Sequence, residues 1–238
     1  MARKRIVFII VEGPSDDEAL ALMLEKLYDK NKVYVYITHG DITTAPGVNS
    51  SNILSKVSKA VDSYAKSTHL SKANFQEIVH ILDMDGAYIP GSAVKDDPSA
   101  KKTIYSLSEI ITSNVTGVLT RNKTKAECID RLSAVKTLWG IPYQAYYMSC
   151  NLDHVLYNKQ NSSDEEKEKD SLAFAKKYKN NFCGFVKFIC ESEFSVDGSY
   201  IESWAFIKQD LHSLERHTNL GICFMNNMVP ISEEVNES

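Results

Sequence analysis

The chain has 238 residues and a formal net charge of −4, with 43% hydrophobic and 24% charged residues. These proportions are typical of a folded globular protein, and the negative charge argues against a protein that binds nucleic acid over its whole surface. No apolar run approaches the ~20 residues that a membrane-spanning helix requires. The five cysteines form no C-x-x-C pair, which argues against a zinc module.

The basic N-terminus is followed by an apolar run of only six residues. A secretory signal has an apolar region of ~7–15 residues, so this segment does not fit one. We therefore expect a cytoplasmic protein that does not associate with membranes. The sequence leaves the oligomeric state open.

The first candidate strand, Ile6–Val11, is apolar throughout and rich in β-branched side chains, which is typical of a strand buried on both faces. It ends at Glu12, and a glycine–proline pair then breaks the strand. A capping-box pattern that begins with Ser15 as the N-cap predicts a helix to about Tyr28. Ligand sites of open α/β sheets lie at the carboxyl ends of strands, so Glu12 is a candidate site residue.

A second candidate strand, Ile78–Leu82, ends in Asp83 and Asp85. Residues two apart in an extended chain point to the same side, so these two carboxylates can converge. If both strands belong to one parallel sheet, Glu12 reaches the same edge. Clustered carboxylates raise each other's pKa unless a cation neutralises them, and hard oxygen ligands of this kind favour Mg²⁺ or Mn²⁺.

The ordered pair of motifs, Glu12-Gly13-Pro14-Ser15-Asp16 after one strand and Asp83-Met84-Asp85 after a later one, resembles the TOPRIM fold. That fold is shared by topoisomerases, bacterial primases, overcoming-lysogenization-defect nucleases and small RNA-maturation nucleases. The resemblance covers roughly residues 1–150. It implies that Glu12, Asp83 and Asp85 are catalytic, and that these three carboxylates and Asp16 bind Mg²⁺ or Mn²⁺.

Two more candidate strands, Lys32–Thr38 and Pro142–Met148, and a candidate helix at about Ser50–His69 complete the pattern. The alternation predicts an α/β fold with a mostly parallel, four-stranded, TOPRIM-like (Rossmann-like) sheet, flanked by helices through right-handed crossovers. We expect a TOPRIM-like catalytic core at residues 1–154. Residues 155–238 are expected to form a mainly helical C-terminal extension packed on this core.

Helices are also expected at three later segments: Thr103–Ile111, Lys125–Leu138 and Ile201–Leu214. A polar linker containing Gly117 and Asn122 separates the first two of them. The charge-dense stretch Asn161–Asp170 is either a loop or the exposed start of a helix to Tyr178. The segment after Pro230 is an acidic tail.

Between Lys95 and Lys136 the chain carries eight basic and five acidic residues, a local net charge of +3. A basic strip beside an acidic metal centre suits a phosphodiester backbone, although the same charges also suit an ordinary solvated surface. The candidates for binding DNA or RNA in this strip are Lys101, Lys102, Arg121, Lys123 and Lys125.

A polar cluster follows the last candidate strand and reaches the same edge if that strand is parallel. Asn151, Asp153 and His154 are therefore second-tier site candidates. The alternative is that Asn151 or Asp153 only caps the helix that follows. His39, at the end of the second strand, is interpreted as a loop residue, and His80, inside the third, as a structural residue.

The sequence therefore predicts divalent-metal-dependent phosphodiester chemistry on nucleic acid by a small TOPRIM nuclease, with a role in phage defence or RNA processing. Neither the extra domains of a topoisomerase nor the zinc module of a primase is evident. One alternative is a haloacid-dehalogenase-like phosphatase, since Leu82–Gly86 resembles the first motif of that family, in which Asp83 would be the nucleophile and Asp85 the acid. A TOPRIM-like module that binds without catalysis is the other alternative.

Overall fold

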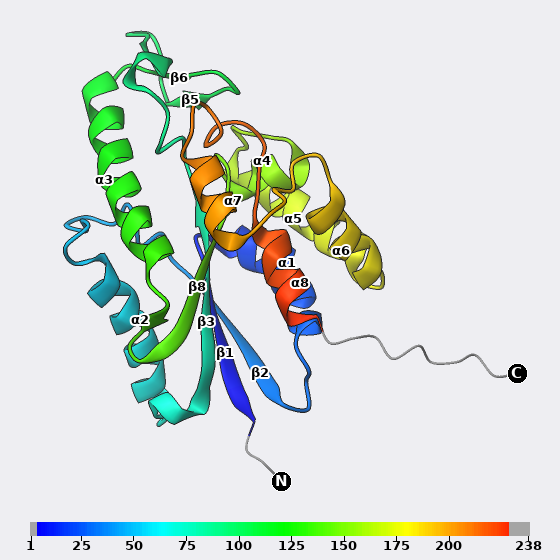
Figure 1. The fold of residues 1–238 in the computed structure, drawn as a ribbon. Helices are drawn as coiled ribbons and strands as arrows, with labels where there is room; N and C mark the ends of the chain where they lie inside the picture. The colour runs from blue at the N-terminus through cyan, green and yellow to red at the C-terminus, as the bar shows by residue number, and fades with distance from the viewer. Residues whose placement is uncertain (1–3, 229–238) are drawn as a thin grey trace, which may run out of the picture.

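The computed structural model describes residues 4–228. Its centre is a five-stranded sheet with the order β2-β1-β3-β8-β7 (Figure 1). The strands are β1 Arg5–Val11, β2 Val33–His39, β3 Phe75–Asp83, β7 Thr137–Leu138 and β8 Ile141–Met148. The first four in spatial order are parallel, and the short edge strand β7 is antiparallel to β8. The α/β class and the four candidate strands are thus confirmed, within a sheet that is mixed.

Helices cover both faces of this sheet. Their bounds are α1 Pro14–Leu27, α2 Ile53–Ser67, α3 Val115–Ala134, α4 Leu152–Tyr157, α5 Asp164–Tyr178, α6 Phe182–Glu191, α7 Tyr200–Ile207 and α8 Leu220–Asn227, with short 3₁₀ turns at Lys72–Asn74 and Gly91–Ala93. Helices α2 and α3 lie against one face, and α1, α5, α6 and α8 lie against the other (Figure 1). The result is a three-layer arrangement.

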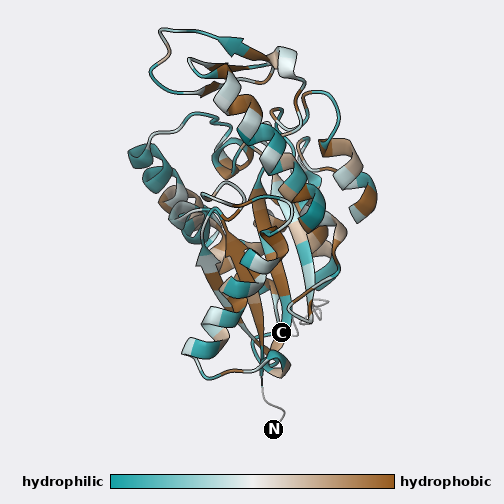
Figure 2. Ribbon diagram, turned by 90° about the vertical axis from the view of Figure 1, so that its left-hand side faces the viewer, coloured by the Kyte–Doolittle hydropathy of each residue, from teal (hydrophilic) through white to brown (hydrophobic). Residues whose placement is uncertain are grey.

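The central strand β1 explains why both faces need cover. Val7, Ile9 and Val11 point into one apolar cluster, while the alternate side chains point into the other. Every residue from Ile6 to Val11 is buried, as expected for a parallel strand packed on both sides. Figure 2 shows this apolar strand layer between helices that carry polar outer surfaces.

A second, three-stranded sheet is inserted between β3 and α3. It consists of β4 Val94–Asp96, β5 Ile104–Tyr105 and β6 Ile110–Thr112, in the order β4-β6-β5. The predicted helix at Thr103–Ile111 is therefore wrong. Strands β5 and β6 form an antiparallel hairpin, and Ile110 is buried in a separate small cluster with Leu214. Burial of this β-branched residue between strands outweighed the weak helical pattern of the segment.

Helix α3 begins before the predicted start at Lys125 and includes the segment expected to be a linker. It ends at Ala134 and not at Leu138, which belongs to β7. Its N-cap is Asn114, whose side chain accepts a hydrogen bond from the Gly117 backbone N at 2.9 Å. The predicted polar linker is wrong because its asparagine, Asn122, lies on the buried side of the helix. Lys125 lies one turn further along the same buried side.

From Leu152 onward the described chain is mainly helical, and α5, α6 and α8 share one apolar cluster with β1 and α1. The charge-dense stretch is the exposed start of α5. The predicted helix to Leu214 ends at Ile207, and a non-helical segment, Leu211–Asn219, which we call the C-terminal strap, leads to α8. The predicted tail after Pro230 lies outside the described residues.

None of the helices within residues 4–228 is both long enough and apolar enough to cross a membrane.

Candidate active site

The turn between β1 and α1 places Glu12 at the carboxyl edge of the sheet. Its Oε1 accepts a hydrogen bond from the Asp83 backbone N at 3.1 Å, which connects the ends of β1 and β3. Helix α1 starts at Pro14 with Gly13 as its N-cap, so the predicted N-cap at Ser15 is wrong. Asp16 takes the capping role instead, since its Oδ2 accepts from the Gly13 N at 2.8 Å.

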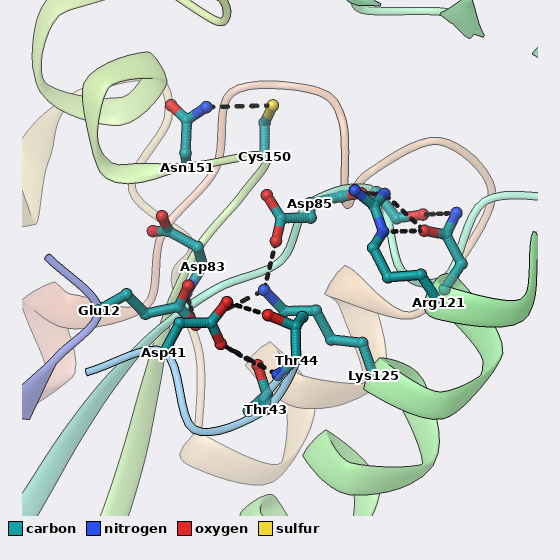
Figure 3. Close-up of polar contacts among 12 residues, drawn as sticks. Glu12, Asp41, Thr43, Thr44, Asp83, Asp85, Arg121, Lys125, Cys150 and Asn151 are labelled. Atoms are coloured by element: carbon teal, nitrogen blue, oxygen red, sulfur yellow. Dashed lines mark hydrogen bonds and ion pairs between the residues drawn. The ribbon is translucent and has the colours of Figure 1, made fainter. Parts of the chain in front are cut away.

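The turn after β3 carries the two predicted aspartates. Asp85 has a φ of 47° and Gly86 a φ of 68°, so the chain reverses through two left-handed residues. Asp85 N donates to the Cys150 carbonyl at 2.7 Å, which attaches this turn to the turn after β8. Glu12 and Asp85 contact the same ammonium group, that of Lys125 (Figure 3). The extended-chain argument for Asp83 and Asp85 is wrong, because β3 ends at Asp83 and Asp85 has a left-handed backbone.

Lys125 lies at the centre of the site rather than on a nucleic-acid-binding surface. Its side chain is fully buried, its Nζ lies 3.5 Å from Glu12 Oε1, and it forms an ion pair with Asp85 Oδ2. The predicted surface role of Lys125 is therefore wrong. The helical spacing of Lys125 with Asn122 and Ile129 places it on the buried side of α3. This spacing could have indicated a buried lysine, which needs a carboxylate partner.

Three carboxylates at this edge, those of Glu12, Asp83 and Asp16, favour protonation unless a cation is present. Burial, together with the charges of Asp41 and Asp85, raises the pKa of Glu12 to about 8 even though Lys125 lowers it. Burial and the nearby Glu12 raise the pKa of Asp83 well above its usual range. Burial raises the pKa of Asp16 to about 6. One lysine therefore does not neutralise the whole cluster.

Lys125 itself stays charged. Burial alone would lower the pKa of its ammonium, but Asp85, Glu12 and the other surrounding carboxylates raise it above the ordinary value. Asp83 is placed differently. In Figure 3 its carboxylate points away from Lys125 and towards the side of Asn151, and no contact to it is drawn. Within residues 4–228, Lys125 therefore forms ion pairs with Glu12 and Asp85 but not with Asp83 or Asp16.

Asp41 is a site residue that the sequence motifs did not identify. It follows β2, and its carboxylate accepts hydrogen bonds from Thr43 Oγ1 at 3.0 Å and Thr44 N at 3.1 Å. Burial would raise the pKa of Asp41, but Lys125 and these hydrogen bonds lower it. The signal was available, because β2 is parallel to β1 and its following loop must reach the same edge. His39, at the end of β2, is exposed.

Two polar residues of α3 hold the turn that contains Asp85. Arg121 Nη2 donates to the Asp85 carbonyl at 3.0 Å, and Asn122 Nδ2 donates to the Gly86 carbonyl at 3.1 Å. Arg121 also donates to the Tyr105 hydroxyl of the inserted sheet. The other candidates for binding nucleic acid, Lys101, Lys102 and Lys123, are exposed.

The second-tier candidates Asn151, Asp153 and His154 lie next to the site, and they differ in their hydrogen bonds and in their charged neighbours. Asn151 is the N-cap of α4, since its Oδ1 accepts from His154 N at 2.9 Å. Asp153 is 3% exposed, lies 3.8 Å from Lys167 Nζ, and its charge raises the pKa of Asp16. His154 is buried, and burial together with the charge of Arg216 lowers its pKa to about 4, so this imidazole is neutral.

The C-terminal strap supports the turns after β3 and β8 together. The Ser213 carbonyl accepts hydrogen bonds from Gly86 N at 3.2 Å and Cys150 N at 2.8 Å. His217 N donates to Ser149 Oγ at 2.6 Å, and Ser149 N donates back to the His217 carbonyl at 2.9 Å. The strap, far downstream in the sequence, therefore positions Asp85 through backbone hydrogen bonds. Backbone contacts of this kind cannot be recognised from a sequence motif.

The donor chemistry of this edge suits a hard cation, because buried carboxylates with raised pKa values gain when a divalent ion binds. Within residues 4–228, however, no three acidic, histidine or cysteine side chains are already arranged as a set that would hold a metal ion. The cation that the chain itself supplies to Glu12 and Asp85 is Lys125.

Comparison of the chain with models of protein families, with curated proteins and with solved structures gave no match.

Proposed function

We propose that the protein is a divalent-metal-dependent phosphodiesterase acting on nucleic acid, a small TOPRIM-like nuclease. The observation that carries the proposal is a group of carboxylates that follow three parallel strands at one sheet edge, close to the buried ammonium of Lys125. Glu12 and the two acids of the Asp83–Asp85 turn are partly buried, and Asp41 is exposed. This edge is where open α/β sheets bind their ligands. A purely structural ion pair would not require further acids beside it.

Mg²⁺ or Mn²⁺ would be held by Glu12 and Asp83, with Asp16 beside them and Asp85 retained by Lys125. This assignment follows from charge, because Asp83 and Asp16 are acids of raised pKa that Lys125 does not contact. A bound divalent ion supplies charge stabilisation at the phosphate and a more acidic water.

The protein's own residues would position the phosphodiester. Lys125 fixes Asp85 and adds positive charge at the centre of the site. A cleft of about 330 Å³ lies between the loop after β2 and α3, and its lining includes Thr44, Thr120, Thr124 and Arg121. Hydroxyls, backbone N–H groups and arginine are common phosphate contacts. Lys101 and Lys102, in the loop between β4 and β5, would contact the nucleic-acid strand farther from the reacting phosphate.

The proposal is tested by incubating the protein with end-labelled single- and double-stranded DNA and RNA in Mg²⁺, Mn²⁺ or EDTA. We expect cleavage that requires the metal and falls by roughly a hundredfold or more in both Glu12→Gln and Asp83→Asn. The control is Asp62→Asn, an acid on α2 whose partner is Lys66. No cleavage of any substrate with either metal, or equal activity in the three variants, would overturn the proposal.

The same variants separate a nuclease from a phosphatase. In a haloacid-dehalogenase-like enzyme Asp83 would form an aspartyl-phosphate and Glu12 would have no chemical role. Hydrolysis of p-nitrophenyl phosphate that survives Glu12→Gln, without polynucleotide cleavage by the wild type, would support the phosphatase. Metal binding without turnover of either substrate would support a non-catalytic module.

A further inference from the structure

The five-stranded sheet has one open lateral edge, formed by β2. The order β2-β1-β3-β8-β7 gives β2 a single neighbour, β1, and Figure 1 shows β2 at the border of the sheet. Its side chains from Tyr34 to Thr38 are exposed or half-buried, whereas every side chain from Ile6 to Val11 in β1 is buried. Within residues 4–228, a full-length strand is therefore paired on one side only.

The other lateral edge of the sheet is covered by the chain itself. There Ala145 N of β8 donates to the Tyr200 hydroxyl at 3.3 Å, and Tyr147 N donates to Asn219 Oδ1 at 2.8 Å. Thr218 Oγ1 donates to the Tyr147 carbonyl at 2.6 Å. Helix α7 and the strap thus occupy outer backbone groups of β8, and β2 has no comparable cover within the described part of the chain.

The unpaired backbone groups of β2 belong to Val35 and Ile37. The Lys32 carbonyl accepts a hydrogen bond from Arg5 N of β1 at 3.1 Å, and in a parallel ladder every second residue of a strand faces the neighbouring strand. The even-numbered residues of β2 therefore bond to β1, and the N–H and C=O groups of Val35 and Ile37 point outward. These adjacent donors and acceptors in extended geometry fit the backbone of another strand.

The edge also lacks the features that keep open edges apart. The segment Val33–Thr38 contains no charged residue, no proline and no glycine, and its register with β1 runs without a bulge. Tyr34 is 60% exposed. Natural edge strands are protected by charges, prolines or bulges, so an uncharged and regular edge of this length indicates a strand partner.

We propose that β2 pairs with β2 of a second copy of this chain, antiparallel across a twofold axis at Tyr36, and joins the two sheets into one continuous sheet. Around such an axis Val35 faces Ile37 of the second copy and Ile37 faces Val35, so each residue exchanges both of its backbone hydrogen bonds. This self-complementary arrangement uses all the outward groups of these two residues in both copies.

The charges at the two ends of β2 favour the antiparallel direction and a second copy as the partner. Lys30 and Lys32 precede the strand, Asp41 follows it, and all three side chains are exposed. Antiparallel pairing places the basic start of one copy beside the acidic end of the other at both ends of the interface, whereas parallel pairing would place like charges together.

A groove beside β2 provides room for a side chain of the second copy. It has a volume of about 270 Å³, and its lining includes Val33, Tyr34, Val35 and Glu25. Neighbouring residues of a strand point to opposite faces, so a hollow lined by three consecutive residues follows the lateral edge. In the proposed register, His39 of the second copy lies opposite Val33, next to this groove.

The pairing leaves both candidate active sites open. The carboxylate edge, where Glu12, Asp83 and Asp85 lie, is at the carboxyl ends of the strands. Because the paired strands run in opposite directions, the two carboxylate edges lie at opposite ends of the joined sheet.

Sedimentation equilibrium of the full chain tests the dimer without any polynucleotide or metal. We expect the average mass to rise from one to two chain masses between low micromolar and submillimolar concentration. Tyr34→Ala should weaken the association about tenfold, because the ring contacts the second copy beside Thr38. The matched control is Ile201→Ala, which removes another exposed apolar side chain, on α7, and should leave the association unchanged. A monomer at every concentration, or equal effects of the two substitutions, would overturn the proposal.

Cysteine cross-linking tests the register, in a Cys183→Ser background that removes the exposed native thiol. Tyr34 lies opposite Thr38 of the second copy, so the double variant Tyr34→Cys/Thr38→Cys should form a disulfide-linked dimer on mild oxidation. Tyr34→Cys alone should not, because its two thiols would lie four residues apart along the paired strands, or about 13 Å. No cross-link in the double variant, or equal cross-linking of the single variant, would overturn the proposed pairing.

Hydrogen exchange of the peptide that contains residues 33–39 identifies what covers the edge. We expect exchange in this peptide to slow as the protein concentration rises, in step with the average mass. Slow exchange that does not depend on concentration would show that a segment of the same chain covers β2, and would overturn the proposal. None of these measurements depends on catalysis, so their failure is distinguishable from failure of the proposed nuclease activity.

Discussion

Lys125 is the residue on which the charge balance of the carboxylate edge depends. It contacts Glu12 and Asp85 from a fully buried position on α3. Removing one partner from a buried ion pair leaves the other charges without compensation, which costs more than the pair contributes as a whole. Lys125 does not contact Asp83 or Asp16, so these two acids are the ones that a divalent cation would have to neutralise.

Lys125→Met should lower the free energy of unfolding by about 3–5 kcal/mol in EDTA. Part of this loss should return on addition of Mg²⁺, because the metal replaces the missing positive charge. Urea unfolding with and without the metal measures both effects. Lys123→Met is the matched control, since Lys123 lies on the exposed side of the same helix, and its change should stay within about 0.5 kcal/mol. Equal effects of the two substitutions would contradict this account.

His80 gives a second prediction at the level of one side chain. Its Nδ1 lies 3.0 Å from the Tyr143 hydroxyl, and burial lowers its pKa to about 3. Between that value and about 6.5, the unfolded chain binds the proton that the folded chain excludes. This residue therefore contributes stability that is lost as the pH falls below about 6.5, by up to ~1.4 kcal/mol per pH unit.

The measurement is the difference in unfolding free energy between wild type and His80→Gln from pH 7 to pH 4.5, in EDTA. We expect the advantage of the wild type to shrink steadily as the pH falls. The exposed His69 serves as the control, and His69→Asn should leave the pH slope unchanged. A difference between wild type and His80→Gln that does not vary with pH would contradict the burial of a neutral imidazole.

At the level of elements, the turn after β3 is held by close packing against the C-terminal strap. A Cβ at Gly86 would lie 2.8 Å from Leu214 Cδ2 and 3.0 Å from Ile110 Cδ1, and the φ of Gly86 is also positive. A methyl group at this position would therefore require the buried side chains of Leu214 and Ile110 to shift. Gly47, with a φ of 76°, has no atom within 4 Å of such a Cβ.

Alanine substitutions at Gly47 and Gly86 distinguish the cost of backbone strain from the cost of overpacking, because only Gly86 has close neighbours. Gly47→Ala should cost about 1–2 kcal/mol, the price of a left-handed alanine. Gly86→Ala should cost this and a further ~1–3 kcal/mol for overpacking, and it should also reduce cleavage because Asp85 moves. Chemical denaturation measures the first effect and the polynucleotide assay the second. Equal stability losses in the two variants would show that the strap does not pack tightly on the turn.

The elements that could be predicted from sequence are those whose pattern is local. An apolar run followed by an acid indicated β1 and β3, and the rule that parallel strands end at one edge brought Glu12 and Asp85 together correctly. Lys125 and Asn122 were missed because polar residues on a buried helix face look like surface or linker residues until their partners are known. The inserted sheet was missed because its strands are two or three residues long, too short to show alternation.

At the level of the whole molecule, the site depends on both ends of the chain. Apolar residues of α5, α6 and α8 share a cluster with β1 and α1, and the strap fixes the turns after β3 and β8. Such contacts between distant segments carry no signal in a single sequence. Backbone hydrogen bonds from the strap therefore position the turns after β3 and β8 together.

The last prediction concerns stability of the whole chain in the presence of metal. A ligand that binds only the folded state stabilises it by RT ln(1 + [L]/Kd), about 2.7 kcal/mol at a hundredfold excess over Kd. For a chain of this length, 1 kcal/mol corresponds to roughly 2–4 °C. Saturating Mg²⁺ or Mn²⁺ should therefore raise the melting temperature of the wild type by several degrees over EDTA, and the double variant Asp83→Asn/Asp85→Asn should abolish this rise.

The control is the double variant Asp96→Asn/Asp164→Asn, which changes two exposed acids and should retain the rise in melting temperature. If the first pair responds to the metal as the wild type does, the cation binds elsewhere and these carboxylates are not its ligands.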